Sequence, residues 1–300
     1  MAWNITDRIT DVASDKIADG IVSKYQGKVI SSYYASLPFS EVPVSFEANG
    51  RTVYGTLCLP TEMKTDVPAV VMLHGTGSAR DEAGDGFKYC APLLASCGIA
   101  SLRIDLIGCG ESKVDYQYYN YTTATEDAVA AKDYLKGLKE IDGNRIGVMG
   151  WSQGGTDALL AAAADKEFKS VCLWAGALDM QMMYTPEMRA EAKKNGFAVM
   201  DLGWRSPLNL GWKWIEEVEG TDMRAVVKKV SAPIFAINGE KDDVVDPASG
   251  AEIAGLASNP SSTYVLIPGA DHTFGVFTDP ELNALSETIA STMQWFASTL

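Results

Sequence analysis

Residues 145–164 read RIGVMGWSQGGTDALLAAAA, an apolar run that a glycine-rich turn joins to an alanine-rich segment. The apolar run is typical of a buried strand, and the alanine-rich segment favours a helix. The turn matches G-x-S-x-G, with a glycine two positions before and two positions after Ser152. Glycine is needed there because a side chain at either position would collide with neighbouring backbone. This strand, turn and helix together indicate a nucleophile elbow, and we expect Ser152 to be a nucleophile at the carboxyl end of the strand.

Apolar runs of similar length alternate with helical patterns along the rest of the chain. The expected strands lie at 69–73, 100–104, 145–149, 170–174, 233–237 and 263–267, and the expected helices lie at about 81–97, 123–139, 154–165, 247–257 and 280–298. Continuous apolar runs are typical of parallel strands that are buried on both faces. Two earlier runs, 42–47 and 52–59, are separated by the hairpin signal Asn49-Gly50. The sequence therefore predicts an α/β fold with a doubly wound, mostly parallel sheet that has an antiparallel start.

The interval between the fourth and fifth of these apolar strands is too long for a simple crossover connection. It is rich in methionine and tryptophan, and we interpret residues 177–229 as an inserted, mainly helical cap. Before the hairpin, isoleucine, valine and tyrosine recur at helical spacing between charged residues, which predicts an N-terminal helical arm over residues 1–40. The α/β core then consists of residues 41–176 and 230–300.

The composition and charge of the chain exclude several classes of function. Its 300 residues are 47% hydrophobic and 21% charged, which favours a compact fold with a large buried core. The net charge of −14 repels phosphate backbones and anionic lipid headgroups, so neither nucleic acid nor a membrane is an expected partner. No apolar run in the sequence reaches the roughly 18 residues that a membrane-spanning helix needs.

The cysteines and the N-terminal residues indicate the cellular compartment of the protein. The five cysteines are odd in number and lack the spacing of a metal site, and they are Cys58, Cys90, Cys97, Cys109 and Cys172. We interpret them as buried thiols, which favours a reducing compartment. The N-terminus lacks the basic and apolar regions of a secretory signal. The sequence therefore predicts a cytoplasmic protein, unless a signal peptide has been removed, and it contains no signal for an oligomeric state.

A serine nucleophile needs a base, and the chain has only two histidines, His74 and His272. His74 ends a strand and begins a loop, where we expect a structural role. His272 follows the last predicted strand, and we expect it to be the base. A carboxylate must hold the tautomer of that histidine, and Asp242, after the preceding strand, is the expected partner. The neighbouring Asp243 and Asp246 are the alternatives for this role.

Several motifs resemble those of the α/β-hydrolase superfamily over residues 42–298. They are HGTG at 74–77, DLIGCGES at 105–112, GWSQGG at 150–155, GEKD at 239–242 and DH at 271–272. The order serine, aspartate, histidine also agrees with that superfamily and differs from the orders in chymotrypsin and subtilisin. With DE at 81–82 and the position of the cap, the chain looks most similar to bacterial carboxylesterases related to cinnamoyl or feruloyl esterases.

This resemblance implies an oxyanion hole formed by the backbone N–H groups of Thr76 and Gln153. Gln153 also begins the helix after the elbow, where free N–H groups and the helix dipole favour a developing negative charge. Asp105, which opens the DLIGCGES motif, is expected to stabilise a turn. The loop DYQYYNY at 115–121 is unusually aromatic for the family, and we interpret it as surface packing.

We expect the protein to hydrolyse small-molecule carboxylic esters with short to medium or aromatic acyl groups. The reaction would pass through an acyl-enzyme and would need neither a metal nor an organic cofactor. In the cap, Trp204, Trp212 and Met183 are candidate substrate-binding residues, because aromatic and thioether groups favour apolar acyl chains.

The same triad would serve other functions. A prolyl-oligopeptidase-like peptidase is one alternative, but an arm of about 40 residues is too short for the propeller domain that such enzymes commonly carry. An acyltransferase and a lactonase would use the same residues. The non-enzymatic alternative is a catalytically inactive hydrolase fold that binds a ligand under its cap.

Overall fold

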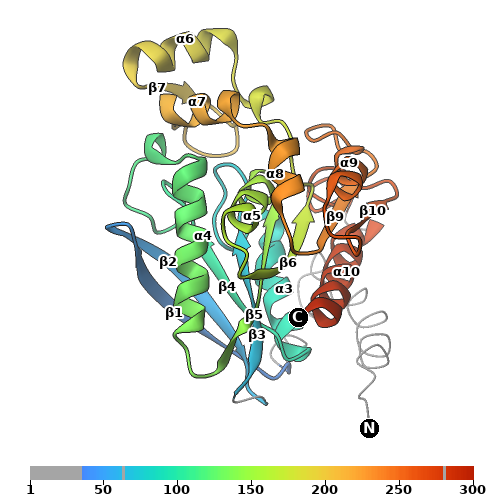
Figure 1. Ribbon diagram of the computed structural model, residues 1–300. Coiled ribbons are helices and arrows are strands. Elements are labelled where there is room, and N and C mark those ends of the chain that lie inside the picture. Colours follow the sequence, from blue (N-terminus) through green and yellow to red (C-terminus); the bar gives the residue numbers. More distant parts are fainter. Residues whose placement is uncertain (1–35, 63–64, 280–281) are drawn as a thin grey trace.

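A central parallel sheet organises the molecule. The computed structural model describes residues 36–62, 65–279 and 282–300, and within them the chain forms an eight-stranded sheet and a separate two-stranded sheet. The strands of the large sheet are β1 (Phe39–Ala48), β2 (Arg51–Pro60), β3 (Val67–Leu73), β4 (Ala100–Asp105), β5 (Ile141–Trp151), β6 (Phe168–Trp174), β9 (Ile234–Gly239) and β10 (Thr263–Ile267). Their order across the sheet is β1-β2-β4-β3-β5-β6-β9-β10 (Figure 1).

The direction of strand pairing changes once along this order. The β1–β2 and β2–β4 pairs are antiparallel, and all later pairs are parallel. The β1–β2 hairpin turns through Asn49 and Gly50, whose φ angles of 47° and 77° are both positive, so their backbone twist matches that of the strands. The predicted fold, a doubly wound and mostly parallel sheet with an antiparallel start, is confirmed.

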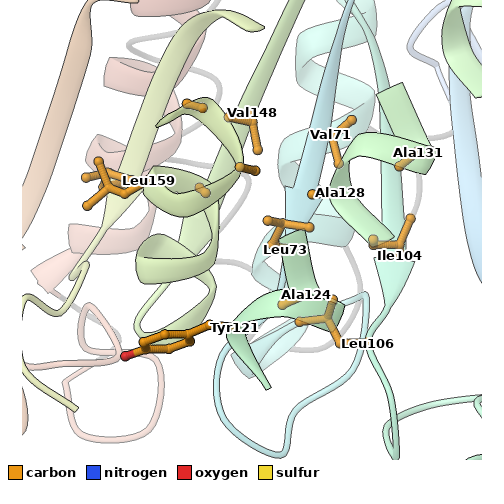
Figure 2. Packing of buried hydrophobic residues seen from close by; sticks show 14 of the residues in the cluster. Val71, Leu73, Ile104, Leu106, Tyr121, Ala124, Ala128, Ala131, Val148 and Leu159 are labelled. Atoms are coloured by element: carbon orange, nitrogen blue, oxygen red, sulfur yellow. The ribbon is translucent and has the colours of Figure 1, made fainter. Parts of the chain in front are cut away.

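Different helices cover the two faces of the large sheet. One face packs against α3 (Gly86–Ser96) and α10 (Ala284–Thr299), and the other packs against α4 (Tyr121–Lys136), α5 (Gln153–Ala164), α8 (Met223–Lys229) and α9 (Ser249–Leu256). Each residue of β3 is buried: Val70 and Met72 face the α3 side, whereas Val71 and Leu73 face the α4 and α5 side. Figure 2 shows the buried hydrophobic residues on the α4 and α5 side of the sheet. Full burial of one such side chain contributes about 1.5–3 kcal/mol.

The segment between β6 and β9 forms most of a cap over one end of the sheet (Figure 1). It contains η3 (Gln181–Met183), α6 (Pro186–Asn195), the antiparallel pair β7 (Phe197–Met200) and β8 (Leu208–Gly211), and α7 (Trp212–Gly220). The expected range 177–229 also includes α8, which packs against α5 and α9 of the core. The N-terminal arm is expected over residues 1–40. Residues 1–35 of this range lie outside the described residues. Among the described helices, none is both long and apolar enough to cross a bilayer.

Two glycines of the elbow allow β3, β5 and α5 to approach closely. A β-carbon on Gly154 would lie 2.0 Å from the carbonyl oxygen of Leu73, and one on Gly150 would lie 1.9 Å from the carbonyl oxygen of Gly154. Both distances are far below van der Waals contact, and the obstructing atoms are backbone atoms that no rotamer change can move. The sequence therefore needs glycine at these two positions for α5 to begin where it does.

We expect Gly154→Ala to lower the free energy of unfolding by about 3 kcal/mol or more, because the added methyl group overlaps backbone. Gly255→Ala in α9 is the matched control, since nothing lies within 4 Å of a β-carbon there. That control should be neutral or stabilising by up to about 1 kcal/mol. Urea unfolding of both variants measures the difference, and equal midpoints for the two would contradict the packing argument.

Candidate active site

Ser152 occupies the turn between β5 and α5 in a strained backbone conformation. Its φ and ψ angles are 56° and −121°, and its N–H donates a hydrogen bond of 2.8 Å to the carbonyl oxygen of Trp174. A non-glycine residue with such positive φ typically costs about 1–3 kcal/mol and persists only where the surroundings impose it. The close packing of Gly150 and Gly154 imposes it here, and Ser152 lines a cavity at the end of the sheet.

His272 pairs with the buried Asp242 at the ends of neighbouring strands. The Nδ1 atom of His272 lies 2.8 Å from the Oδ2 atom of Asp242, and the Asp242 side chain is fully buried. The other carboxylate oxygen accepts hydrogen bonds from the N–H groups of Val244 and Val245, at 2.9 and 2.8 Å. This pairing holds the Nδ1–H tautomer, so Nε2 is the nitrogen that can accept a proton. His272 and Ser152 line the same cavity.

The alternatives to Asp242 and His272 occupy other environments. Asp243 and Asp246 are exposed, and Asp246 accepts a hydrogen bond of 2.9 Å from the N–H of Ala248. His74 is buried, its Nδ1 lies 2.8 Å from the Gly75 carbonyl oxygen, and its Nε2 accepts from the N–H of Leu106 at 3.0 Å. Burial lowers the pKa of His74, which favours the neutral ring. Both ring nitrogens of His74 are thus used in holding strand ends together.

Asp105 stabilises the turn that follows β4. Its two carboxylate oxygens accept hydrogen bonds from the N–H groups of Arg80 and Glu111, at 2.9 and 3.0 Å. A β-carbon on Gly110 would lie 2.1 Å from the Asp105 carboxyl carbon, so the turn closes directly over that carboxylate. Asp105 therefore connects two loops beside the site.

The two residues predicted to form the oxyanion hole are joined through their side chains. The hydroxyl of Thr76 donates to Oε1 of Gln153 at 3.0 Å, and Nε2 of Gln153 lies 3.5 Å from the Tyr116 hydroxyl. Gln153 is the first residue of α5, where backbone N–H groups have no partner within the helix. The arrangement keeps the Thr76 loop and the start of α5 at a fixed separation, as two donors aimed at one oxygen require.

The aromatic loop at 115–121 packs against the start of α5 and contacts Gln153. Tyr116 stacks on Tyr119 with ring centroids 5.2 Å apart, and the Tyr119 hydroxyl donates to Asp157 of α5 at 2.6 Å. Burial raises the pKa of Asp157 to about 8. Sequence reasoning missed the contact of Tyr116 with Gln153. The available signal was the unusual density of tyrosine in a loop that follows a strand end.

Trp151, which precedes Ser152, connects it to the loop of His272. Its ring N–H donates to the carbonyl oxygen of His272 at 3.1 Å. The ring centroid of Trp151 lies 5.2 Å from that of Trp174 and 5.4 Å from that of Phe274. The loop that carries His272 therefore rests on an aromatic cluster, and the second residue of the elbow motif was the sequence signal for it.

The cavity that holds Ser152 and His272 has a volume of about 710 Å³. Its other lining residues are mostly apolar, and they are Gly75, Thr76, Ser78, Glu82, Ala83, Trp151, Met183, Leu202, Trp204, Val244, Thr273 and Phe277. Met183 and Trp204 of the cap line this cavity. Trp212 lies elsewhere, because its ring packs against the cationic groups of Arg189 and Lys193, 5.4 and 5.7 Å from its centroid.

In the part of the chain that the structure describes, no group of three or more His, Cys, Asp or Glu side chains could hold a metal ion. All five cysteines are free thiols. Burial raises the pKa of each of them, and it raises the pKa of Cys109, beside the site, to about 12.

Comparisons with known proteins agree with this fold. A model of the prolyl oligopeptidase family matches residues 86–300. The chain is 26% identical over 193 residues to 2,6-dihydropseudooxynicotine hydrolase of Paenarthrobacter nicotinovorans. The matched region covers 59% of this chain and 45% of that protein, so the chain spans less than half of this relative's length. Among solved structures, Est1E from Butyrivibrio proteoclasticus with ferulic acid bound has a TM-score of 0.69 at 21% identity, over 84% of this chain and 98% of Est1E. Dienelactone hydrolase from Anabaena variabilis has a TM-score of 0.62 at 21% identity, over 88% and 99%.

We expect Asp242→Asn to lower kcat on any substrate by about 10³–10⁴-fold, because the amide would stabilise the wrong tautomer of His272. Asp243→Asn and Asp246→Asn remove the same charge from the same loop and should each change kcat by less than about threefold. Steady-state kinetics on the three variants gives the ranking. A larger loss in Asp243→Asn than in Asp242→Asn would assign the carboxylate role to the neighbouring residue.

Proposed function

Because the chain belongs to the prolyl oligopeptidase family, we propose that it is a serine hydrolase whose substrates are carboxylic esters of small molecules. One observation carries the proposal: Ser152 and a histidine paired with a buried aspartate line one cavity, which is mostly apolar. A cavity of about 710 Å³ accommodates a ligand with an acyl group of short or medium length. The ferulic acid bound to Est1E, a protein of the same fold, supports aromatic acyl groups among the candidates.

The reaction has two halves that share one histidine. In the first, Nε2 of His272 takes the proton of Ser152 while Oγ attacks the ester carbonyl carbon. The N–H groups of Thr76 and Gln153 stabilise the oxyanion, and the C–O bond breaks as the leaving alcohol receives the proton from His272. In the second, His272 removes a proton from water, the hydroxide attacks the acyl-enzyme, and Ser152 leaves with the proton restored. Asp242 stays ionised and stabilises the imidazolium in both halves.

Peptide cleavage is the second candidate, because the matching family is named for an oligopeptidase. A peptide substrate presents N–H and C=O groups along its whole length, and these need polar partners in the enzyme. Among the described residues that line the cavity, outside the proposed triad and oxyanion hole, the polar side chains other than tryptophan are those of Ser78, Glu82 and Thr273. The predominantly apolar lining therefore favours esters over extended peptides.

We expect a fluorophosphonate probe to label wild-type protein at Ser152 and to leave Ser152→Ala unlabelled. Turnover should fall by about 10⁴-fold or more in that variant, since it removes the nucleophile itself. Ser261→Ala, at an exposed position outside the cavity, should be labelled and active like wild type. Mass spectrometry of the labelled peptide identifies the residue. Persistent labelling of Ser152→Ala at another serine would assign the nucleophile elsewhere.

We expect 4-nitrophenyl butyrate to be hydrolysed with a kcat/KM at least about 100-fold higher than that of a prolyl 4-nitroanilide peptide. The ester fits an apolar cavity, whereas the peptide leaves backbone groups unpaired at a cost of roughly 1–3 kcal/mol each. Methyl ferulate and methyl acetate, measured beside them, test the preference for an aromatic acyl group. Faster cleavage of the anilide than of every ester would favour the peptidase function.

A further inference from the structure

Glu82 is a carboxylic acid in the wall of the substrate cavity that the proposed mechanism does not use. Among the described residues that line this cavity, Glu82 is the single acidic one, and neither lysine nor arginine is present. The remaining wall includes the aromatic side chains of Trp151, Trp204 and Phe277. The last two are 63% and 70% exposed, so their rings are free for a ligand to cover.

The backbone around Glu82 is held in an unusual conformation. Glu82 has φ and ψ angles of 63° and 178°, a region that glycine alone adopts without strain. The preceding residue, Asp81, anchors the segment through a 3.2 Å contact with the buried Arg103. Backbone strain of about 1–3 kcal/mol at a large side chain is characteristic of functional positions. The strain places the carboxyl group in the cavity wall.

The carboxyl group lies close to the nucleophile. Oε2 of Glu82 accepts a hydrogen bond of 2.8 Å from the N–H of Gly75. A β-carbon on Gly75 would lie 3.3 Å from Cβ of Ser152 and 3.6 Å from Oε1 of Glu82, so these two side chains flank the same glycine. A substrate bound to Ser152 therefore has the Glu82 carboxyl group within a few ångströms.

Hydrogen bonds and burial act in opposite directions on the charge of Glu82. Burial raises the pKa of its carboxyl group to about 7, although hydrogen bonds from Gly75, Ala83 and Ser78 and the charge of His272 favour the ionised form. Above that pH the group is a carboxylate that water solvates poorly. Its two oxygens offer about four acceptor sites in all, so it can still bind a further donor.

We propose that Glu82 is a specificity-determining residue that binds a positively charged group of the substrate against the aromatic wall of the cavity. A carboxylate attracts a cation directly, and the faces of Trp204 and Phe277 add cation–π stabilisation. The net charge of −14 also attracts cationic substrates at long range. This inference rests on the proposed esterase function and extends it to esters that carry a quaternary or protonated amine.

Three matched 4-nitrophenyl esters test the proposal at pH 8. They are the neutral butyrate, the cationic 4-(trimethylammonio)butyrate and the anionic hemisuccinate. Wild-type kcat/KM should be highest for the cationic ester and lowest for the anionic one. Glu82→Gln, which removes the charge at constant size, should lower the cation-to-anion ratio by on the order of 10- to 100-fold. A purely structural role of Glu82 would change all three esters alike and leave this ratio unchanged.

Two control variants separate the local charge from other effects. Glu82→Asp keeps the charge and should keep the wild-type ranking of the three esters. Glu216→Gln changes the net charge equally at an exposed position in α7 and should keep the wild-type ratio within about threefold. An unchanged ratio in Glu82→Gln, or the same fall in Glu216→Gln, would overturn the proposal. So would a wild-type preference for the hemisuccinate, which tests the inference even if Glu82→Gln does not fold.

A second measurement distinguishes failure of this inference from failure of the esterase function. The rate of Ser152 labelling is compared for a neutral alkyl fluorophosphonate and for one that carries a trimethylammonium group. Hydrolysis of the butyrate without any charge preference would leave the esterase function intact and refute the role of Glu82. Cation-selective labelling that Glu82→Gln abolishes, without turnover of any ester, would refute the esterase function and retain the role of Glu82.

Discussion

The contact of backbone with backbone at the start of α5 determines where the other groups of the site lie. Gly154 packs directly on the Leu73 carbonyl at the end of β3, and this contact brings the loop that follows β3 beside Ser152. Thr76 of that loop then lies within hydrogen-bond distance of the Gln153 side chain. A single methyl group at Gly154 would separate Ser152, the proposed nucleophile, from the loop of Thr76, a proposed oxyanion donor. The chemistry therefore depends on the absence of a side chain as much as on the presence of Ser152.

An aromatic cluster on the opposite face of the sheet supports the loop that carries His272, the proposed base. Trp151 and Trp174 end the neighbouring strands β5 and β6, and Phe274 follows His272 by two residues. The ring N–H of Trp151 holds the backbone of His272, and the N–H of Ser152 is held by Trp174. Ser152 and His272 are thus both held by this pair of tryptophans, His272 by Trp151 and Ser152 by Trp174. Their relative position is fixed by packing within the core and by two hydrogen bonds to backbone.

Sequence reasoning placed candidate residues at strand ends and missed the groups that depend on contacts between loops. Ser152, Asp242 and His272 each follow an apolar run, where parallel strands carry functional groups at their carboxyl ends. The elbow motif singled out Ser152, and the presence of only two histidines led to His272. Asp242 could not be separated from Asp243 by pattern, since the choice depends on which side chain turns inward. The packing of Trp212 against α6 and the β7–β8 pair inside the cap rest on contacts between segments, which local patterns do not encode.

The cap contacts the loop that carries Thr76, one of the two proposed oxyanion donors. Arg205 of the cap donates to the carbonyl oxygen of Gly77, and a β-carbon on Gly77 would collide with Leu202 and Leu208 of the cap. Leu202 also lines the substrate cavity, and Gly77 follows Thr76 directly. Displacement of the cap would therefore act on the loop that carries Thr76. We expect ligands that fit beneath the cap to leave this proposed donor in place and bulkier ligands to displace it, so that selectivity would act on the chemical step as well as on binding.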